Sequence, residues 1–124
     1  MRVILDTNFL TLPAQFKVDI FGEIGMLLEG GYQLYIMEGT VAELERLAGS
    51  QKEDAKAAKI ALRMLETRGV KVLPSKESYV DDAILEAADG ETIVATNDRK
   101  LIKKLKDKSI KVIFLRGKNR LSMG

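Results

Sequence analysis

Short runs of apolar, often β-branched residues alternate with helical patterns along this chain, and this alternation limits the fold more than any other feature. The runs have the length and composition of buried strands and lie at residues 2–6, 33–37, 70–74, 92–96 and 111–115. Helical spacing of apolar residues fills the intervals, at 17–29, 39–48, 50–68, 79–88 and 98–108. Because parallel strands need crossover connections, and these are right-handed, the pattern predicts a three-layer α/β/α sandwich with a central parallel sheet.

Two of the predicted helices begin with a capping-box pattern, in which a serine is followed three residues later by an acid. Ser50 with Glu53 opens the helix over 50–68, and Ser78 with Asp81 opens the helix over 79–88. We therefore expect each serine to cap the helix that follows it.

Composition restricts the chemistry that the chain can perform. Its 124 residues fit one domain, over residues 1–124. We expect a cytoplasmic protein with no membrane partner, because the sequence shows neither a long apolar stretch nor a secretory signal. The chain has no cysteine and no histidine, so carboxylates, hydroxyls, amides and basic side chains must do any chemistry. Oxygen ligands of this kind favour Mg²⁺ or Mn²⁺.

The net charge of +2 conceals an uneven distribution of charge along the chain. Residues 1–98 carry a net charge of −7, whereas residues 99–124 carry +9. One interpretation is a solvated helix face followed by a soluble tail. The other is a basic surface that contacts a phosphate backbone, because Lys and Arg supply most nucleic-acid affinity.

Two acidic residues lie where predicted strands end. Asp6 closes the strand 2–6, and Asp98 lies two residues beyond the strand 92–96. Taken alone, each is explained as a helix cap or a turn residue. Ligands of such folds bind at the carboxyl ends of strands, where strand order reverses. If these two strands are neighbours there, their carboxylates converge.

Two further acidic positions are ambiguous from periodicity. Glu43 and Glu45 occupy opposite borders of the apolar stripe of one helix, and a solvated helix face explains either. Asp81 and Asp82 both stand in the first turn of another helix, where one acid suffices to favour the helix dipole. Acids gathered from four segments at one sheet edge nevertheless favour a divalent-cation site.

The order and context of these acids resemble those of the PIN domain, a family of small metal-dependent ribonucleases. The matching strings are "ILDTN", "VAEL", "DAILEAA" and "ATND", and they span almost the whole chain. The resemblance implies a parallel sheet in the order 3-2-1-4-5, which would make the first and fourth strands adjacent.

Carried over by position, the resemblance implies metal-binding, catalytic acids at Asp6, Glu43, Asp82 and Asp98. It favours Glu43 over Glu45 because the family's glutamate directly precedes a leucine. It favours Asp82 over Asp81 because an alanine follows the family's aspartate, although Asp81 stays a candidate ligand. Polar positions around the family's site correspond to Thr7, Asn8, Thr96 and Asn97.

The resemblance implies a Mg²⁺- or Mn²⁺-dependent endoribonuclease whose partner is RNA. The basic segment would then hold the RNA backbone, through Arg99, Lys100, Lys103, Lys104, Arg116, Lys118 and Arg120. The family includes ribosomal-RNA processing nucleases and toxins paired with antitoxins, and the sequence looks somewhat more like the processing branch. Such domains often form homodimers.

Two other functions compete with the nuclease. A non-catalytic RNA-binding or assembly module would keep the fold and dock its basic end on ribosomal RNA or a protein partner. A phosphoryl-transfer domain also begins with an Asp after its first strand, but Asn8 stands where a dehalogenase-type site needs a second Asp. A receiver-type site would need an Asp after the third strand, where this chain has "SKESYVDD". The intact set of acids argues against the RNA-binding module.

Overall fold

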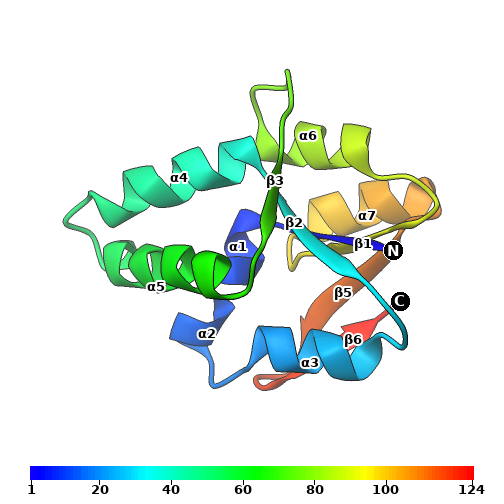
Figure 1. Ribbon diagram of the computed structural model, residues 1–124, viewed down its shortest axis with the longest axis horizontal. Helices are drawn as coiled ribbons and strands as arrows, with labels where there is room; N and C mark the ends of the chain where they lie inside the picture. Colours follow the sequence, from blue (N-terminus) through cyan, green and yellow to red (C-terminus); the bar gives the residue numbers. More distant parts are fainter.

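The computed structural model describes all 124 residues, and its strands form a single sheet. Figure 1 shows the strands β1 (Arg2–Leu5), β2 (Gln33–Met37), β3 (Lys71–Leu73), β4 (Thr92–Ala95), β5 (Lys111–Arg116) and β6 (Arg120–Met123). The order across the sheet is β3-β2-β1-β4-β5-β6, with the first five strands parallel. The expected order of five parallel strands is therefore confirmed, and β1 does lie beside β4.

The sixth strand differs from the expectation of a soluble tail. β6 pairs antiparallel with β5, so that Leu115 faces Leu121 across the pair. Gly117, with φ of 73°, begins the short turn between them, a left-handed conformation that glycine adopts without strain. Leu121 is buried, and its N–H donates to a Glu23 side-chain oxygen at 3.1 Å. That bond occupies part of the exposed sheet edge.

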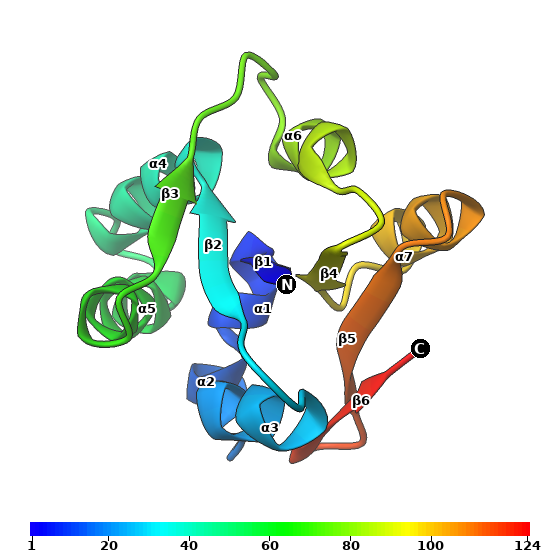
Figure 2. The same cartoon turned by 45° about the vertical axis from the view of Figure 1, so that its right-hand side comes forward.

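Helices cover both faces of the sheet, as Figure 2 shows. One face carries α1 (Thr7–Leu10), α2 (Leu12–Gln15), α3 (Ile20–Leu27), α4 (Glu38–Ala48) and α5 (Asp54–Thr67); the other carries α6 (Val80–Ala87) and α7 (Arg99–Asp107). The alternation of strand side chains explains the two cores: Val3 and Leu5 enter the first, whereas Ile4 enters the second. The three-layer prediction is confirmed. No helix has both the length and the apolar run needed to cross a membrane.

Both predicted capping boxes are wrong. α5 begins at Asp54 without a side-chain cap, and the Ser50 hydroxyl instead donates to the Leu47 carbonyl at the end of α4. α6 follows Tyr79, which also makes no side-chain capping bond. Serine can bond backbone groups before it as well as after it in the chain. Ser50 bonds the end of the preceding helix, α4, rather than the start of α5.

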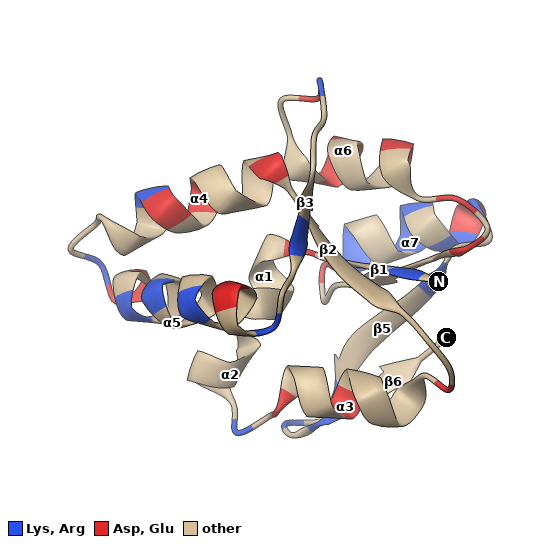
Figure 3. Ribbon diagram, viewed as in Figure 1, with Lys and Arg blue, Asp and Glu red and all other residues tan.

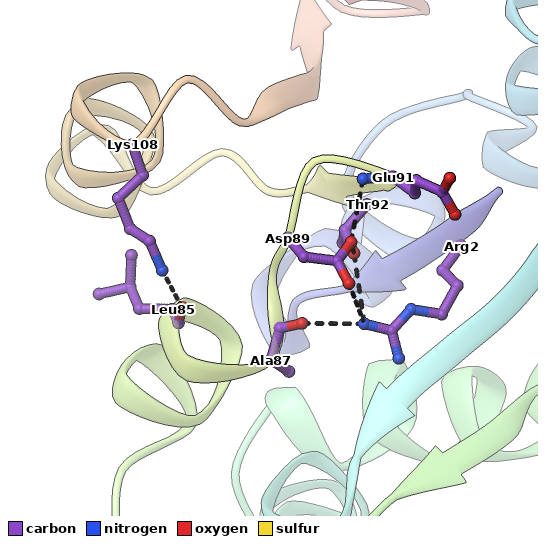
Figure 4. A network of polar contacts seen from close by, with 7 residues as sticks. All are labelled: Arg2, Leu85, Ala87, Asp89, Glu91, Thr92 and Lys108. Carbon is purple, nitrogen blue, oxygen red and sulfur yellow. Dashed lines mark hydrogen bonds and ion pairs between the residues drawn. The ribbon is translucent and has the colours of Figure 1, made fainter.

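A polar network joins elements at the amino edge of the sheet (Figure 4). Arg2 donates to the Ala87 carbonyl at 2.9 Å and forms an ion pair with Asp89 at 3.7 Å. Nearby, the Lys108 ammonium donates to the Leu85 carbonyl and links α7 to α6. These groups tie the start of β1 to the end of α6. The acids predicted to act together lie at the opposite, carboxyl edge.

Candidate metal centre

Asp6 stands at the carboxyl end of β1 and is almost completely buried, with 4% of its surface exposed. Its backbone N–H donates to the Ala95 carbonyl of β4 at 2.9 Å. One carboxylate oxygen, Oδ1, accepts from the Thr7 N–H at 2.9 Å, and the other, Oδ2, accepts from the Thr96 hydroxyl at 2.6 Å. Burial raises the pKa of Asp6 to about 6, and repulsion from Asp81 and Asp98 adds to that rise, while the two hydrogen bonds oppose it.

The fully buried Thr96 hydroxyl connects Asp6 to Asp98. It donates to Asp6 and accepts from the Asp98 N–H at 3.1 Å. Asp98 then caps α7, where its Oδ1 accepts from the N–H groups of Lys100 at 2.9 Å and Leu101 at 3.2 Å. Both capping bonds use one oxygen. Asp98 therefore does cap a helix, as expected when this residue is considered on its own. The cap leaves Oδ2 of Asp98 without a capping bond.

Glu43 reaches the same region from α4. It is half-buried, and one of its carboxylate oxygens lies 3.2 Å from the Thr7 hydroxyl, which is also 3.0 Å from the buried Thr40 hydroxyl. A hydroxyl has one proton and an ionised carboxylate only accepts. An ionised Glu43 therefore accepts a hydrogen bond from the Thr7 hydroxyl, and Thr40 is then the donor in its bond with Thr7. Glu45, in contrast, is exposed.

The start of α6 supplies the last acid. Asp81 is half-buried, whereas Asp82 is exposed. The pKa of Asp81 is raised, first by burial and then by repulsion from Asp98, and Lys104 partly offsets this. The start of α6 packs closely on Gly39 of α4. A Cβ at Gly39 would lie 3.1 Å from a Val80 methyl carbon, so the absence of a side chain there allows α6 to approach α4.

Asp6, Glu43, Asp81 and Asp98 line one cavity of about 400 Å³. Asp82 lines a neighbouring cavity that shares Glu43, Val80 and Asp81 with the first. Figure 3 shows acidic positions at the facing starts of α4 and α6. No three carboxylates are already close enough together to hold one metal ion. The donor set nevertheless fits a divalent cation, because it is made of carboxylate oxygens. Burial first, and neighbouring acids second, raise the pKa values of two of these carboxyls, Asp6 and Asp81.

The polar positions expected around the site separate into two groups. Thr7 and Asn8 line the acidic cavity, and Thr96 bonds Asp6 as described. Asn97 does not line the cavity; its side-chain oxygen accepts from the Leu115 N–H of β5 at 2.7 Å. Asn97 therefore holds the turn after β4 against β5.

The predicted RNA-binding residues lie in two places. Arg99, Lys100, Lys103 and Lys104 are exposed on α7, which begins directly after Asp98, and of these Lys104 lines the neighbouring cavity. The hairpin of β5 and β6 carries the others, which line neither cavity: Arg116, Lys118 and Arg120.

Sequence reasoning missed two charged residues at the cavities. Asp54, in the first turn of α5, lines the acidic cavity. Arg46 lies on α4 three residues after Glu43 and lines the neighbouring cavity. The spacing of three residues, which places two side chains on one helix face, was the signal that could have found Arg46.

A sequence model of the family described as "PIN like domain" matches residues 3–118. The chain is 33% identical to ribonuclease VapC4 of Methanocaldococcus jannaschii, over 94% of this chain and 92% of that protein. It is 34% identical to ribonuclease VapC9 of Archaeoglobus fulgidus, over 95% and 85%. It is 32% identical to the rRNA-processing protein fcf1 of Schizosaccharomyces pombe, over 85% of this chain and 53% of that longer protein.

Solved structures show the same architecture. The PIN domain endonuclease Utp24 superposes with a TM-score of 0.81 at 28% identity, and the match covers 98% of this chain and 90% of that one. VapBC-1 from nontypeable Haemophilus influenzae gives a TM-score of 0.60 at 18% identity, over 86% and 94%. The second likeness concerns the fold alone.

Proposed function

The chain belongs to the PIN-like domain family, and on that premise we propose that it is an endoribonuclease that hydrolyses RNA with Mg²⁺ or Mn²⁺ held by its acidic cavity. Its curated relatives are named as ribonucleases and as an rRNA-processing protein. One observation carries the proposal: Asp6, Asp81, Asp98 and Glu43 line a single cavity at the carboxyl ends of β1 and β4.

Asp6, Asp81 and Asp98 are the residues that would hold the cation. Burial and, after it, repulsion from neighbouring acids raise the pKa values of Asp6 and Asp81, and a divalent cation would offset that repulsion. When bound, such an ion activates a water molecule and neutralises the charge that develops on the phosphate. Asp82 is exposed beside this group, so we propose Asp81 as the ligand and Asp82 as a neighbour of the site.

Glu43 would act on the attacking water. The Thr7 hydroxyl bonds one of its carboxylate oxygens, Oε1, so Oε2 is the atom that faces a water and accepts its proton. Thr40 behind Thr7 fixes the direction of that hydroxyl. The Thr96 hydroxyl would hold the Asp6 carboxylate in place and also accepts from the backbone N–H of Asp98. The exposed amines at the start of α7 would contact RNA phosphates beside the cavity.

Cleavage of a 5′-labelled single-stranded RNA by the purified protein tests the proposal. We expect cleavage with Mg²⁺ or Mn²⁺, none with EDTA, and a loss of about 100-fold or more in Asp6→Asn and Asp98→Asn. Asparagine caps helices as well as aspartate does, so both variants should fold. Glu45→Gln removes an exposed acid from the same helix as Glu43 and serves as the matched control. Undiminished cleavage by Asp6→Asn would contradict the proposed chemistry.

The non-catalytic RNA-binding module makes a different forecast for the same protein. It binds RNA without needing a cation and shows no Mn²⁺ binding by calorimetry. The nuclease binds Mn²⁺, and Asp6→Asn weakens that binding.

We propose processing of ribosomal RNA as the biological role, supported by the TM-score of 0.81 to the Utp24 PIN domain and the likeness to fcf1. A toxin of a toxin–antitoxin pair is the second candidate, supported by the 33% identity to VapC4 over nearly its full length. Two experiments in the host of this protein separate these roles. Expression of a toxin alone arrests growth until a small neighbouring gene is co-expressed. Depletion of a processing nuclease leaves uncut rRNA precursors.

A further inference from the structure

A second cavity opens directly beside the acidic one and differs from it in composition. Its volume is about 710 Å³, and it shares the walls formed by Glu43 and Asp81. Asp82 lines it as a third acid, and two cations also line it, Arg46 from α4 and Lys104 from α7, together with Tyr79. An aromatic ring and two cations beside a nuclease centre are the features that bind an unpaired nucleotide.

The side chain of Tyr79 lies largely outside the protein core. It is 73% exposed, and it is the only aromatic residue among the exposed large hydrophobic side chains. It precedes α6, yet its side chain makes no capping bond to that helix. The loop that presents it is fixed at its base, where the Ser75 N–H donates to a Glu38 side-chain oxygen at 3.0 Å. Figure 1 shows this loop rising between β3 and α6.

The two cations are placed to receive the phosphates of that nucleotide. Arg46 stands one helical turn after Glu43, and Lys104 lines the same cavity as Asp81. Each therefore stands beside one of the acids that the two cavities share. A strand that crosses this boundary would place one base on Tyr79 while the next phosphate enters the acidic cavity.

Building on the proposed endoribonuclease function, we propose that this second cavity binds one unstacked nucleotide next to the scissile phosphate. In this arrangement Tyr79 stacks on the base, and Arg46 and Lys104 hold the flanking phosphates. The site restricts the substrate to single-stranded RNA, because a base paired in a duplex cannot leave its stack without cost. Stacking tolerates any base, so the site selects strandedness rather than sequence.

Binding of fluorescein-labelled single-stranded RNA, followed by anisotropy in an Asp6→Asn background that keeps the RNA intact, tests this directly. We expect Tyr79→Ala to bind about 5- to 150-fold more weakly, and Tyr79→Phe to bind like its parent. Arg46→Ala and Lys104→Ala should each make the negative slope of log affinity against log salt concentration less steep by about 0.7. Lys106→Ala, two residues along α7 and outside the cavity, is the charge-matched control.

Abasic substitutions locate the contact. One position of the RNA should lose affinity when its base is removed, and that loss should disappear in Tyr79→Ala, because the two changes delete the same contact. Additive losses at every position, or equal affinity of Tyr79→Ala and its parent, would overturn the inference. Tyr79 is exposed, so circular dichroism should show all variants folded.

The outcome separates this inference from the function on which it rests. If the unmodified protein cleaves RNA and Tyr79 is irrelevant to affinity, only the nucleotide site is wrong. If RNA binding depends on Tyr79 but no metal-dependent cleavage occurs, the site stands and the nuclease function falls. If the purified protein neither binds nor cleaves RNA, both the nucleotide site and the nuclease function are wrong.

Discussion

Replacing Asp6 by asparagine should stabilise the protein at neutral pH while abolishing its activity. Asp6 is a buried carboxylate whose pKa is about 6 in the folded protein, against an ordinary value of 3.8. At about 1.4 kcal/mol per pKa unit, this difference corresponds to about 3 kcal/mol. Asparagine has nearly the same shape, accepts the same capping bond from the Thr7 N–H, and carries no charge.

The sign of the pH dependence follows from the direction of the shift. Between about pH 4 and pH 6 the folded chain keeps a proton on Asp6 that the unfolded chain has released, so the contribution of Asp6 to stability falls as pH rises through this window. Below about pH 4, Asp6 is protonated in both the folded and the unfolded chain, and Asp6→Asn should not change the free energy of unfolding. Above about pH 6, the folded chain carries a buried ionised carboxylate, and Asp6→Asn should have a free energy of unfolding about 3 kcal/mol higher than the unmodified protein.

Urea unfolding in EDTA, followed by far-ultraviolet circular dichroism because the chain has no tryptophan, measures this at pH 4 and pH 7. Glu45→Gln removes an exposed charge and should change the unfolding free energy by less than about 0.5 kcal/mol at both pH values. Mn²⁺ should then stabilise the unmodified protein and not the variant. If Asp6→Asn is less stable at pH 7, or its effect is the same at both pH values, the argument that burial destabilises the ionised Asp6 carboxylate fails.

Three further outcomes test the geometry of the site. Thr96→Val should reduce cleavage about 10- to 100-fold and move the acidic limb of its pH profile upward, because the buried carboxyl beside it loses its hydroxyl donor, whereas Thr96→Ser should restore both. Asp81→Asn should weaken Mn²⁺ binding, measured by calorimetry, more than Asp82→Asn does, because only the first carboxyl lines the acidic cavity. Gly39→Ala should lower cleavage with only a small change in melting temperature, because its methyl group presses on the first residue of α6 and shifts that helix start.

The strands and the meeting of the first and fourth acids were predictable because both depend on short-range patterns. Each buried strand is a continuous apolar run, and the helical segments between them require parallel crossovers. Asp6 and Asp98 follow strands that the sheet order makes neighbours. β6 was missed because its four residues are too few to show a clear alternation, although Gly117 and Asn119 carried a turn signal.

The choices within each acidic pair depend on contacts that periodicity does not contain. Glu43 faces the cavity because the Thr7 hydroxyl, 36 residues earlier in the chain, bonds it there. Asp81 faces the cavity because α6 approaches α4 over Gly39. Both are packing events between segments far apart in sequence. The resemblance to the family favoured Glu43, which lines the acidic cavity, and Asp82, which is exposed and lines the neighbouring cavity.

Capping and cation binding were weighed as competing explanations for Asp6 and Asp98, and the structure shows that they are compatible. A carboxylate has two oxygens, and each of these residues uses only Oδ1 to cap its helix. A cap explains the hydrogen bonds to one oxygen, but it does not explain why the Asp6 carboxyl is buried beside two other acids. A lone capping acid normally has a lowered pKa, because it accepts N–H bonds near a helix N-terminus. The pKa of Asp6 is raised despite those bonds, first by burial and then by repulsion from Asp81 and Asp98. The burial of this carboxyl beside two other acids, rather than the absence of a structural role, is therefore what points to a cation at this edge of the sheet.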